Sequence, residues 1–199
     1  MEKVKKITGY RLFLPLSCLL IVLLINLITT PTFFKISITN GVLYGYIIDV
    51  INRASELVVL AVGMTLVVSA SAGTDISVGA VMAVAASVCT RILAAGEVSV
   101  NEYANPYILA VLGGLAVAVV CGCFNGFLVA KLKIQPMVAT LILFTAGRGI
   151  SQLVTNGQIT YIRVDSYKLL GNNIPGIPIP TPIFVAVIVV ALAYVLLKK

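Results

Sequence analysis

Long apolar stretches without any charge divide this chain into segments. Residues 12–34, 57–74, 103–130 and 169–197 contain no Asp, Glu, Lys or Arg. Each stretch can supply the roughly 20 apolar residues that a helix needs to cross a bilayer. The runs are continuously apolar and do not alternate with polar residues, so the pattern favours membrane-spanning helices over strands.

We therefore predict about six transmembrane helices, in a polytopic membrane helical bundle of the all-α class. The segment GNNIPGIPIPTP (171–182) holds four prolines and two glycines, and we expect it to be non-helical. The predicted spans are 12–30, 55–73, 76–95, 107–130, 136–154 and 182–197, with linkers at 31–54, 96–106, 131–135 and 155–181.

Composition supports this class. The chain has 199 residues, of which 60% are hydrophobic and 11% charged, with a mean hydropathy of +1.09. A soluble domain carries about 25% charged residues. The N-terminal stretch resembles a signal peptide, but its apolar run is too long and no small-residue cleavage site follows. We interpret it as the first span of a single transmembrane domain covering 1–199.

The basic residues predict the orientation, because cytoplasmic loops of membrane proteins are enriched in Lys and Arg. With the N-terminus in the cytoplasm, eight basic residues lie inside and five outside, with Arg148 within a span. The net charge of +7 is then mainly a topology signal, and no contiguous basic domain suggests nucleic acid. The inner set is Lys3, Lys5, Lys6, Arg11, Lys131, Lys133, Lys198 and Lys199; the outer set is Lys35, Arg53, Arg91, Arg163 and Lys168.

Metal chemistry has little support in the sequence. The chain has no histidine, and its four cysteines, Cys18, Cys89, Cys121 and Cys123, lie in apolar spans without Cys-x-x-Cys spacing. We expect no metal site, and cysteines that act as small buried apolar side chains.

Small residues recur at every fourth position of the fourth span, with a shorter series in the third. Small residues let helices approach closely, which is a main source of helix association in lipid. We expect these positions to serve helix packing and not to line a pore. They are Ala110, Gly114, Ala118, Gly122, Gly126 and Ala130, followed by Gly79, Ala83 and Ser87.

Four polar residues within apolar surroundings are candidates for a translocation pathway or a structural polar contact. Asp75 and Ser77 lie between the second and third spans, where either can cap a helix N-terminus. Arg148 lies well inside a span and needs a carboxylate or a polar cavity, so an Asp75–Arg148 pair is one hypothesis. Asn125 is expected to hydrogen-bond between helices.

Two segments resemble a known family. The first is AVGMTLVVSASAGTDISVGAVMAVAA (61–86), and the second is NGFLVAKLKIQPMVATLILFTAGRGISQLVTNGQ (125–158). They are similar, in order, to motifs of the permease subunits of bacterial ABC sugar importers of the ribose, galactose and xylose type. The similarity is greatest to members that import galactofuranose and related monosaccharides.

The resemblance implies a non-catalytic permease subunit in the bacterial cytoplasmic membrane. It implies a second permease copy or homologue, an extracytoplasmic sugar-binding protein, and an ATPase subunit that binds the ATP and Mg, so that this chain needs no cofactor. By position, Asp75 and Ser77 match the family's Gly-Gly-Ile-Asp-Leu-Ser element, which reads Ala72-Gly73-Thr74-Asp75-Ile76-Ser77 here. Asn125 and Arg148 match the second block.

Family members have about ten spans, and the resemblance covers only their N-terminal part. We therefore expect a chain that is truncated on its C-terminal side or encoded as half of a split permease, and that does not couple to ATP hydrolysis alone. The alternatives are an inactive fragment, or a secondary transporter or channel, although no internal repeat supports the latter. No nucleophile–base constellation suggests an enzyme.

Overall fold

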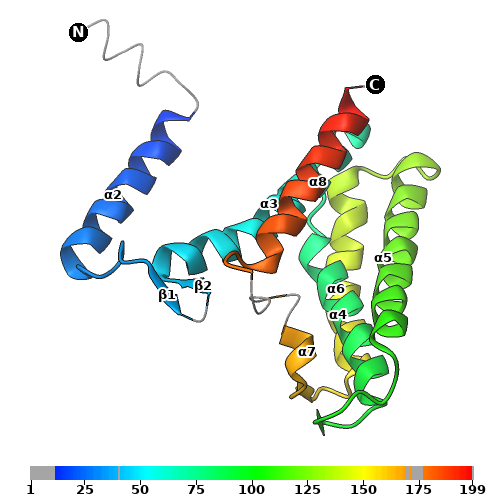
Figure 1. Ribbon diagram of the computed structural model, residues 1–199. Helices are drawn as coiled ribbons and strands as arrows, with labels where there is room; N and C mark the ends of the chain where they lie inside the picture. Colours follow the sequence, from blue (N-terminus) through cyan, green and yellow to red (C-terminus); the bar gives the residue numbers. More distant parts are fainter. Residues whose placement is uncertain (1–11, 40, 169–170, 172–176, 199) are drawn as a thin grey trace, which may run out of the picture.

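The computed structural model describes residues 12–39, 41–168, 171 and 177–198 (Figure 1). In these residues, an apolar helix lies at each of the six predicted spans. Three of them, α3, α5 and α6, are long and apolar enough to cross a membrane, and the other three have 17 residues each. The helices are α2 (Phe13–Thr29), α3 (Tyr46–Ser71), α4 (Val78–Ala94), α5 (Tyr107–Ala130), α6 (Pro136–Val154) and α8 (Thr181–Leu197).

Prolines mark the beginnings of three helices. Pro106 precedes the first residue of α5, Pro136 opens α6, and Pro182 lies in the first turn of α8. Proline suits these positions because the first N–H groups of a helix have no partner within the helix. The predicted bounds of the fourth and fifth spans, 107–130 and 136–154, agree with α5 and α6.

The linker predicted at 31–54 is partly wrong. Strands β1 (Ser37–Thr39) and β2 (Val42–Tyr44) form an antiparallel hairpin there, and α3 begins at Tyr46 instead of 55. The polar residues that suggested a loop have helical spacing, which gathers them on one face of α3; they are Asp49, Asn52, Arg53 and Glu56. In the proline-rich segment, residues 172–176 lie outside the described residues, and Thr181 and Pro182 already belong to α8.

The core is formed by α4 with α5 on one side and α6 on the other (Figure 1). A Cβ atom on Gly114 of α5 would lie 3.1 Å from the Ala85 carbonyl oxygen of α4. On the other side, Ser151 of α6 donates a hydrogen bond from Oγ to the Ala83 carbonyl oxygen, at 3.2 Å. Helix α3 pairs with α8, whereas α2 has no buried residue and lies apart from the bundle.

The C-terminal ends of α4 and α6 are joined by a short parallel pair, β3 (Ser99–Val100) with β4 (Tyr161–Ile162). Beside it lie α7 (Asp165–Lys168) and three contacting rings, Tyr103, Tyr107 and Tyr167. Burial raises the pKa of Tyr167 above its usual value. The pairing shows that the linkers after α4 and α6 lie at the same end of the bundle, which we call the strand end.

Candidate functional site

The turn between α3 and α4 is fixed by close contacts with α6. Ala72 ends α3 in the left-handed conformation, with φ of 52°. A Cβ atom on the next residue, Gly73, would lie 2.5 Å from the Pro136 ring, so no larger residue fits there. The Ile76 N–H donates to Thr140 Oγ1 at 3.2 Å. The turn is therefore enclosed by protein on its α6 side.

A chain of hydrogen bonds runs from this turn into α5. Asp75 Oδ1 accepts from both the backbone N–H and the hydroxyl of Ser77, each at 2.7 Å. Ser77 Oγ in turn accepts from Asn125 Nδ2 at 2.9 Å. Ser77 is 0% exposed and Asn125 is 8% exposed. These contacts bring together three of the four polar candidates, although 48 positions separate Ser77 from Asn125.

The Asp75 carboxylate thus stabilises the residue that precedes α4. Ser77 occupies the N-cap position, but its hydroxyl makes no cap hydrogen bond to the helix. Asp75 bonds the N–H of Ser77 instead, two residues along the chain, as Asx turns do. The predicted side-chain cap on the first turn of α4 is therefore not formed, and Asp75 instead accepts from the residue at the N-cap position.

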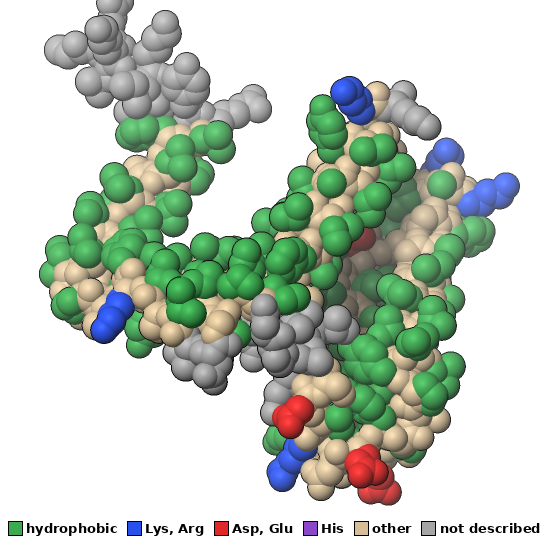
Figure 2. Space-filling view, viewed as in Figure 1, with side chains coloured by type: hydrophobic (Ala, Val, Ile, Leu, Met, Phe, Trp, Pro, Cys, Tyr) green, Lys and Arg blue, Asp and Glu red, His purple; other side chains and the backbone are tan. Residues whose placement is uncertain are grey.

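Two hollows meet at this polar chain. The larger, of about 500 Å³, lies between the last turn of α3, the C-terminal half of α5 and the start of α6. The other, of about 310 Å³, lies between the middle of α3, the beginning of α4 and the middle of α5. Four residues border both hollows: Val67, Asp75, Gly122 and Asn125. Figure 2 shows the molecule hollowed between α8 and α5.

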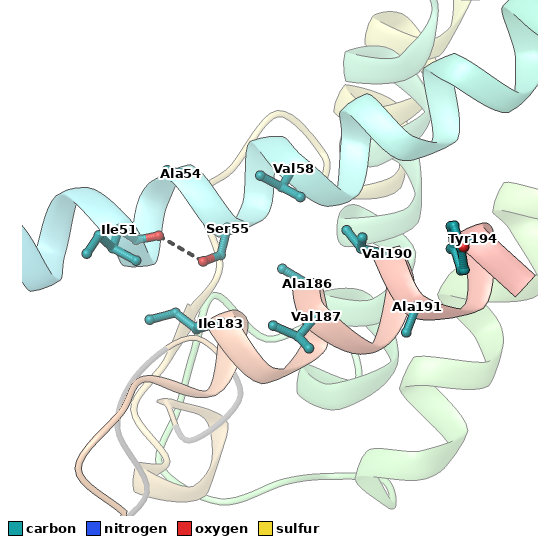
Figure 3. A pocket seen from close by; sticks show the side chains of 10 residues that line it. All are labelled: Ile51, Ala54, Ser55, Val58, Ile183, Ala186, Val187, Val190, Ala191 and Tyr194. Atoms are coloured by element: carbon teal, nitrogen blue, oxygen red, sulfur yellow. Dashed lines mark hydrogen bonds between the residues drawn. The ribbon is translucent and has the colours of Figure 1, made fainter. Parts of the chain in front are cut away.

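A third hollow, of about 580 Å³, lies between α3 and α8, but its lining is apolar (Figure 3). Its hydroxyl-bearing residues are Ser55 and Tyr194, and Ser55 Oγ already donates to the Ile51 carbonyl oxygen of its own helix at 2.8 Å. Ligand sites combine an apolar wall with a few placed polar groups. The hollows at Asp75 and Asn125 fit that description better.

Arg148 is not part of this cluster. Its neighbour Gly147 faces Ala80 of α4, so Arg148, about 100° further round α6, is turned to the exposed side. Its guanidinium carbon lies 4.2 Å from the centre of the Phe144 ring. No ion pair joins Arg148 to Asp75, both of which are described, so the pairing hypothesis is wrong for this structure.

The small residues of α4 and α5 have two kinds of environment. Ala110 and Gly114 are buried against α4, and Ala83 supplies the carbonyl that bonds Ser151. By contrast, a Cβ atom on Gly79, Gly122 or Gly126 would have no described atom within 4 Å. Ala118 and Gly122 line the smaller hollow, and Gly122 and Gly126 the larger. Their role in helix packing stays a prediction.

Thr140 and Lys133 also belong to the site, although the sequence did not single them out. Thr140 is 3% exposed and holds the turn through Ile76, and Lys133 borders the larger hollow. Thr140 follows Pro136 by one helical turn, which puts it at the same end of α6. A polar residue one turn into the otherwise apolar first half of the span is the signal that points to it.

An apolar bundle with a polar cluster between two hollows defines a multi-pass membrane protein of the transporter class. Residues 46–199 match the family described as the permease component of the branched-chain amino acid transport system. The match covers most of the chain, and the chain belongs to this family. No solved structure matches it.

Curated relatives are named as sugar transporters. The chain is 41% identical to the galactofuranose transporter permease protein YtfT of Escherichia coli. The aligned region of 184 residues covers 92% of this chain and 51% of the relative. It is 34% identical to the fructose import permease FruF of Bifidobacterium longum, over 98% of the chain and 54% of the relative. It is 34% identical to the ribose import permease RbsC of Haemophilus influenzae, over 90% of the chain and 51% of the relative. The chain spans about half the length of these relatives.

Proposed function

We propose that this chain forms part of the permease of an ABC importer that moves a monosaccharide across the cytoplasmic membrane. The observation that carries the proposal is the polar chain Asp75–Ser77–Asn125, held where two hollows meet inside an apolar bundle. Buried polar groups in a membrane bundle are costly and mark substrate pathways. The names of the relatives support a sugar as the cargo.

The chain supplies the pathway and not the energy. In this proposal a separate ATPase subunit binds ATP and Mg, and the permease itself holds no cofactor and catalyses no reaction. An extracytoplasmic sugar-binding protein delivers the sugar, and a second permease copy or homologue completes the membrane unit. We further propose that the N-terminus lies in the cytoplasm, which puts the strand end outside.

Deleting the locus in its own host tests the function. We expect loss of saturable uptake of one of three labelled probes, D-galactose, D-ribose or D-fructose, and recovery when the locus is restored. Normal uptake of all three after deletion would contradict the proposal.

The energy source separates an ABC importer from a secondary transporter. Uptake of the affected sugar should stop when cellular ATP is depleted. It should persist when an uncoupler collapses the proton gradient while glycolysis maintains ATP. The reverse pattern would assign the chain to a secondary transporter.

A further inference from the structure

The side-chain amide of Asn125 is unusual because half of it is unpartnered. Its Oδ1 atom is buried and accepts no hydrogen bond in the described part of the chain. A buried acceptor without a partner is unfavourable, because it has lost its hydrogen bonds to water, and most such groups in proteins are satisfied. The neighbouring contacts explain why this amide oxygen is left alone.

The hydrogen-bond chain determines which way the amide points. The Asp75 carboxylate only accepts, so the Ser77 hydroxyl uses its single hydrogen to donate to Asp75. Ser77 Oγ is then left as an acceptor, and only the NH₂ group of Asn125 can bond to it. Asp75, acting through Ser77, therefore turns the Asn125 carbonyl oxygen away from the network.

Asn125 lies on the border that the two hollows share. Asn125 and Asp75 are the polar residues among the four that border both hollows, so they lie where the two hollows adjoin. On the α5 side of this boundary, Gly122 leaves open space. No hydrogen bond reaches the second Asp75 oxygen, Oδ2, in the described residues, so the boundary offers acceptors and carries negative charge.

We infer that Asn125 is a specificity-determining residue at the boundary between the two hollows, where its carbonyl oxygen accepts a hydrogen bond from a hydroxyl group of a neutral, polyhydroxylated cargo. The inference rests on the proposed function and adds how the pathway recognises its sugar. A hydroxyl donor satisfies the buried oxygen, whereas an apolar molecule leaves it unpartnered and an anion meets the Asp75 carboxylate. Recognition by a buried acceptor discriminates against analogues that lack the donor.

The test compares cargo selectivity in two permease variants placed at the natural locus, so that every partner is the natural one. Asn125→Leu removes the acceptor at similar size. Ser151→Ala is the matched control, because it removes one hydrogen bond between α4 and α6, and Ser151 borders neither hollow. The probes are the imported sugar and its singly deoxygenated and singly fluorinated analogues, each measured at saturating concentration.

The measured quantity is the uptake rate of the sugar divided by that of each analogue. Because all variants share one sugar-binding protein, its own preference cancels when these ratios are compared. At one hydroxyl position we expect Asn125→Leu to lower the wild-type ratio roughly three- to tenfold, the worth of one hydrogen bond. Ser151→Ala should keep the ratio. Wild-type ratios at every position in Asn125→Leu would overturn the inference.

Fluorinated analogues test the direction of the hydrogen bond at the hydroxyl position where Asn125→Leu lowers the ratio. Fluorine cannot donate, so fluorination at the recognised position should reduce uptake as much as deoxygenation does. Recovery by fluorine would mean that the protein donates there, and would overturn the inference. If the locus imports none of the three sugars, the proposed function and the inference fail together; if it imports one without these effects, only the inference fails.

Two variants of Asp75 test its positioning role through the same ratio. In Asp75→Asn, the amide oxygen still accepts from Ser77, so the Asn125 amide keeps its orientation and the ratio is retained. In Asp75→Ala, the Ser77 hydroxyl is free to donate to Asn125, the amide rotates, and the ratio falls as in Asn125→Leu. A merely structural role would change the amount of folded protein and leave the ratio unchanged in both.

Discussion

At the scale of single residues, α3 ends with an alanine in a backbone conformation that favours glycine. The sequence element that resembles the family's Gly-Gly pair begins here with Ala72. Its φ of 52° lies in the left-handed region, which costs a residue with a Cβ atom about 1–2 kcal/mol relative to glycine. The turn forms despite this cost because Gly73, Ile76 and Asp75 are held by their contacts.

We therefore expect Ala72→Gly to stabilise the protein by about 1 kcal/mol, since glycine adopts this conformation without strain. The control is the same substitution at Ala61, in the middle of α3, where glycine should cost about 1 kcal/mol. Thermal unfolding of the purified protein in detergent measures both. A lower unfolding temperature for Ala72→Gly would contradict the strain at this turn.

Also at this scale, the sequence predicts most residues of the polar cluster but not the contacts between them. Asp75, Ser77 and Asn125 stand out because they are polar residues in apolar surroundings. That Asn125 contacts Ser77 depends on how α4 and α5 are rotated about their axes, and a span that is apolar on every side gives little information on rotation. The rotation of α6 about its axis is equally undetermined by its sequence, and for this reason the predicted pairing of Arg148 with Asp75 is wrong.

At the scale of the elements, the packing of α6 on α4 depends on Gly147. A Cβ atom there would lie 3.1 Å from the Ala80 Cβ, whereas one on Gly149 meets no described atom within 4 Å. The two glycines are neighbours in sequence on either side of Arg148 but have different surroundings. Sequence alone does not tell them apart.

Substituting each glycine by leucine should separate them. Gly147→Leu forces α6 away from α4, and overpacking of this kind typically costs 1–3 kcal/mol, so we expect a loss of about that size. Gly149→Leu should be neutral or stabilise by up to about 0.8 kcal/mol through helix propensity. The measurement is again thermal unfolding in detergent. Equal losses for both would mean that a further segment packs against Gly149.

The sequence predicts the helices better than the connections between them. The predicted spans 107–130 and 136–154 agree with α5 and α6 to the residue. The start of α3 is misjudged because Asp49 and Arg53 look like loop residues until their helical spacing is considered. The pairing of β3 with β4 has no sequence signal, since strands of two residues contain no pattern and their partners are far apart in the chain.

At the scale of the whole molecule, the two ends of the bundle differ in charge. Lys131 and Lys198 cap the C-terminal ends of α5 and α8, which lie at the end opposite β3 and β4. Figure 2 shows basic side chains at that end, and acidic side chains mixed with a basic one at the strand end. Basic residues favour the cytoplasmic side, so this asymmetry supports an orientation with the strand end outside.

Two cysteine substitutions at opposite ends of α5 test this orientation. The helix has 24 residues and is therefore about 36 Å long, enough to cross the roughly 30 Å hydrocarbon layer. Glu102 and Lys131 are exposed, one in the linker before α5 and one directly after it. In spheroplasts, a membrane-impermeant maleimide should label Glu102→Cys, and should label Lys131→Cys only after the membrane is permeabilised.

The unsubstituted chain sets the background of this experiment, because its own cysteines all lie within apolar helices; they are Cys18, Cys89, Cys121 and Cys123. Labelling of Lys131→Cys alone in intact spheroplasts would reverse the orientation and put the larger hollow, which Lys133 borders, on the outside. Labelling of both would mean that α5 does not cross the membrane. With the expected pattern, a sugar entering from outside reaches the hollow beside the middle of α3 first, then the Asn125 boundary, and leaves past Lys133.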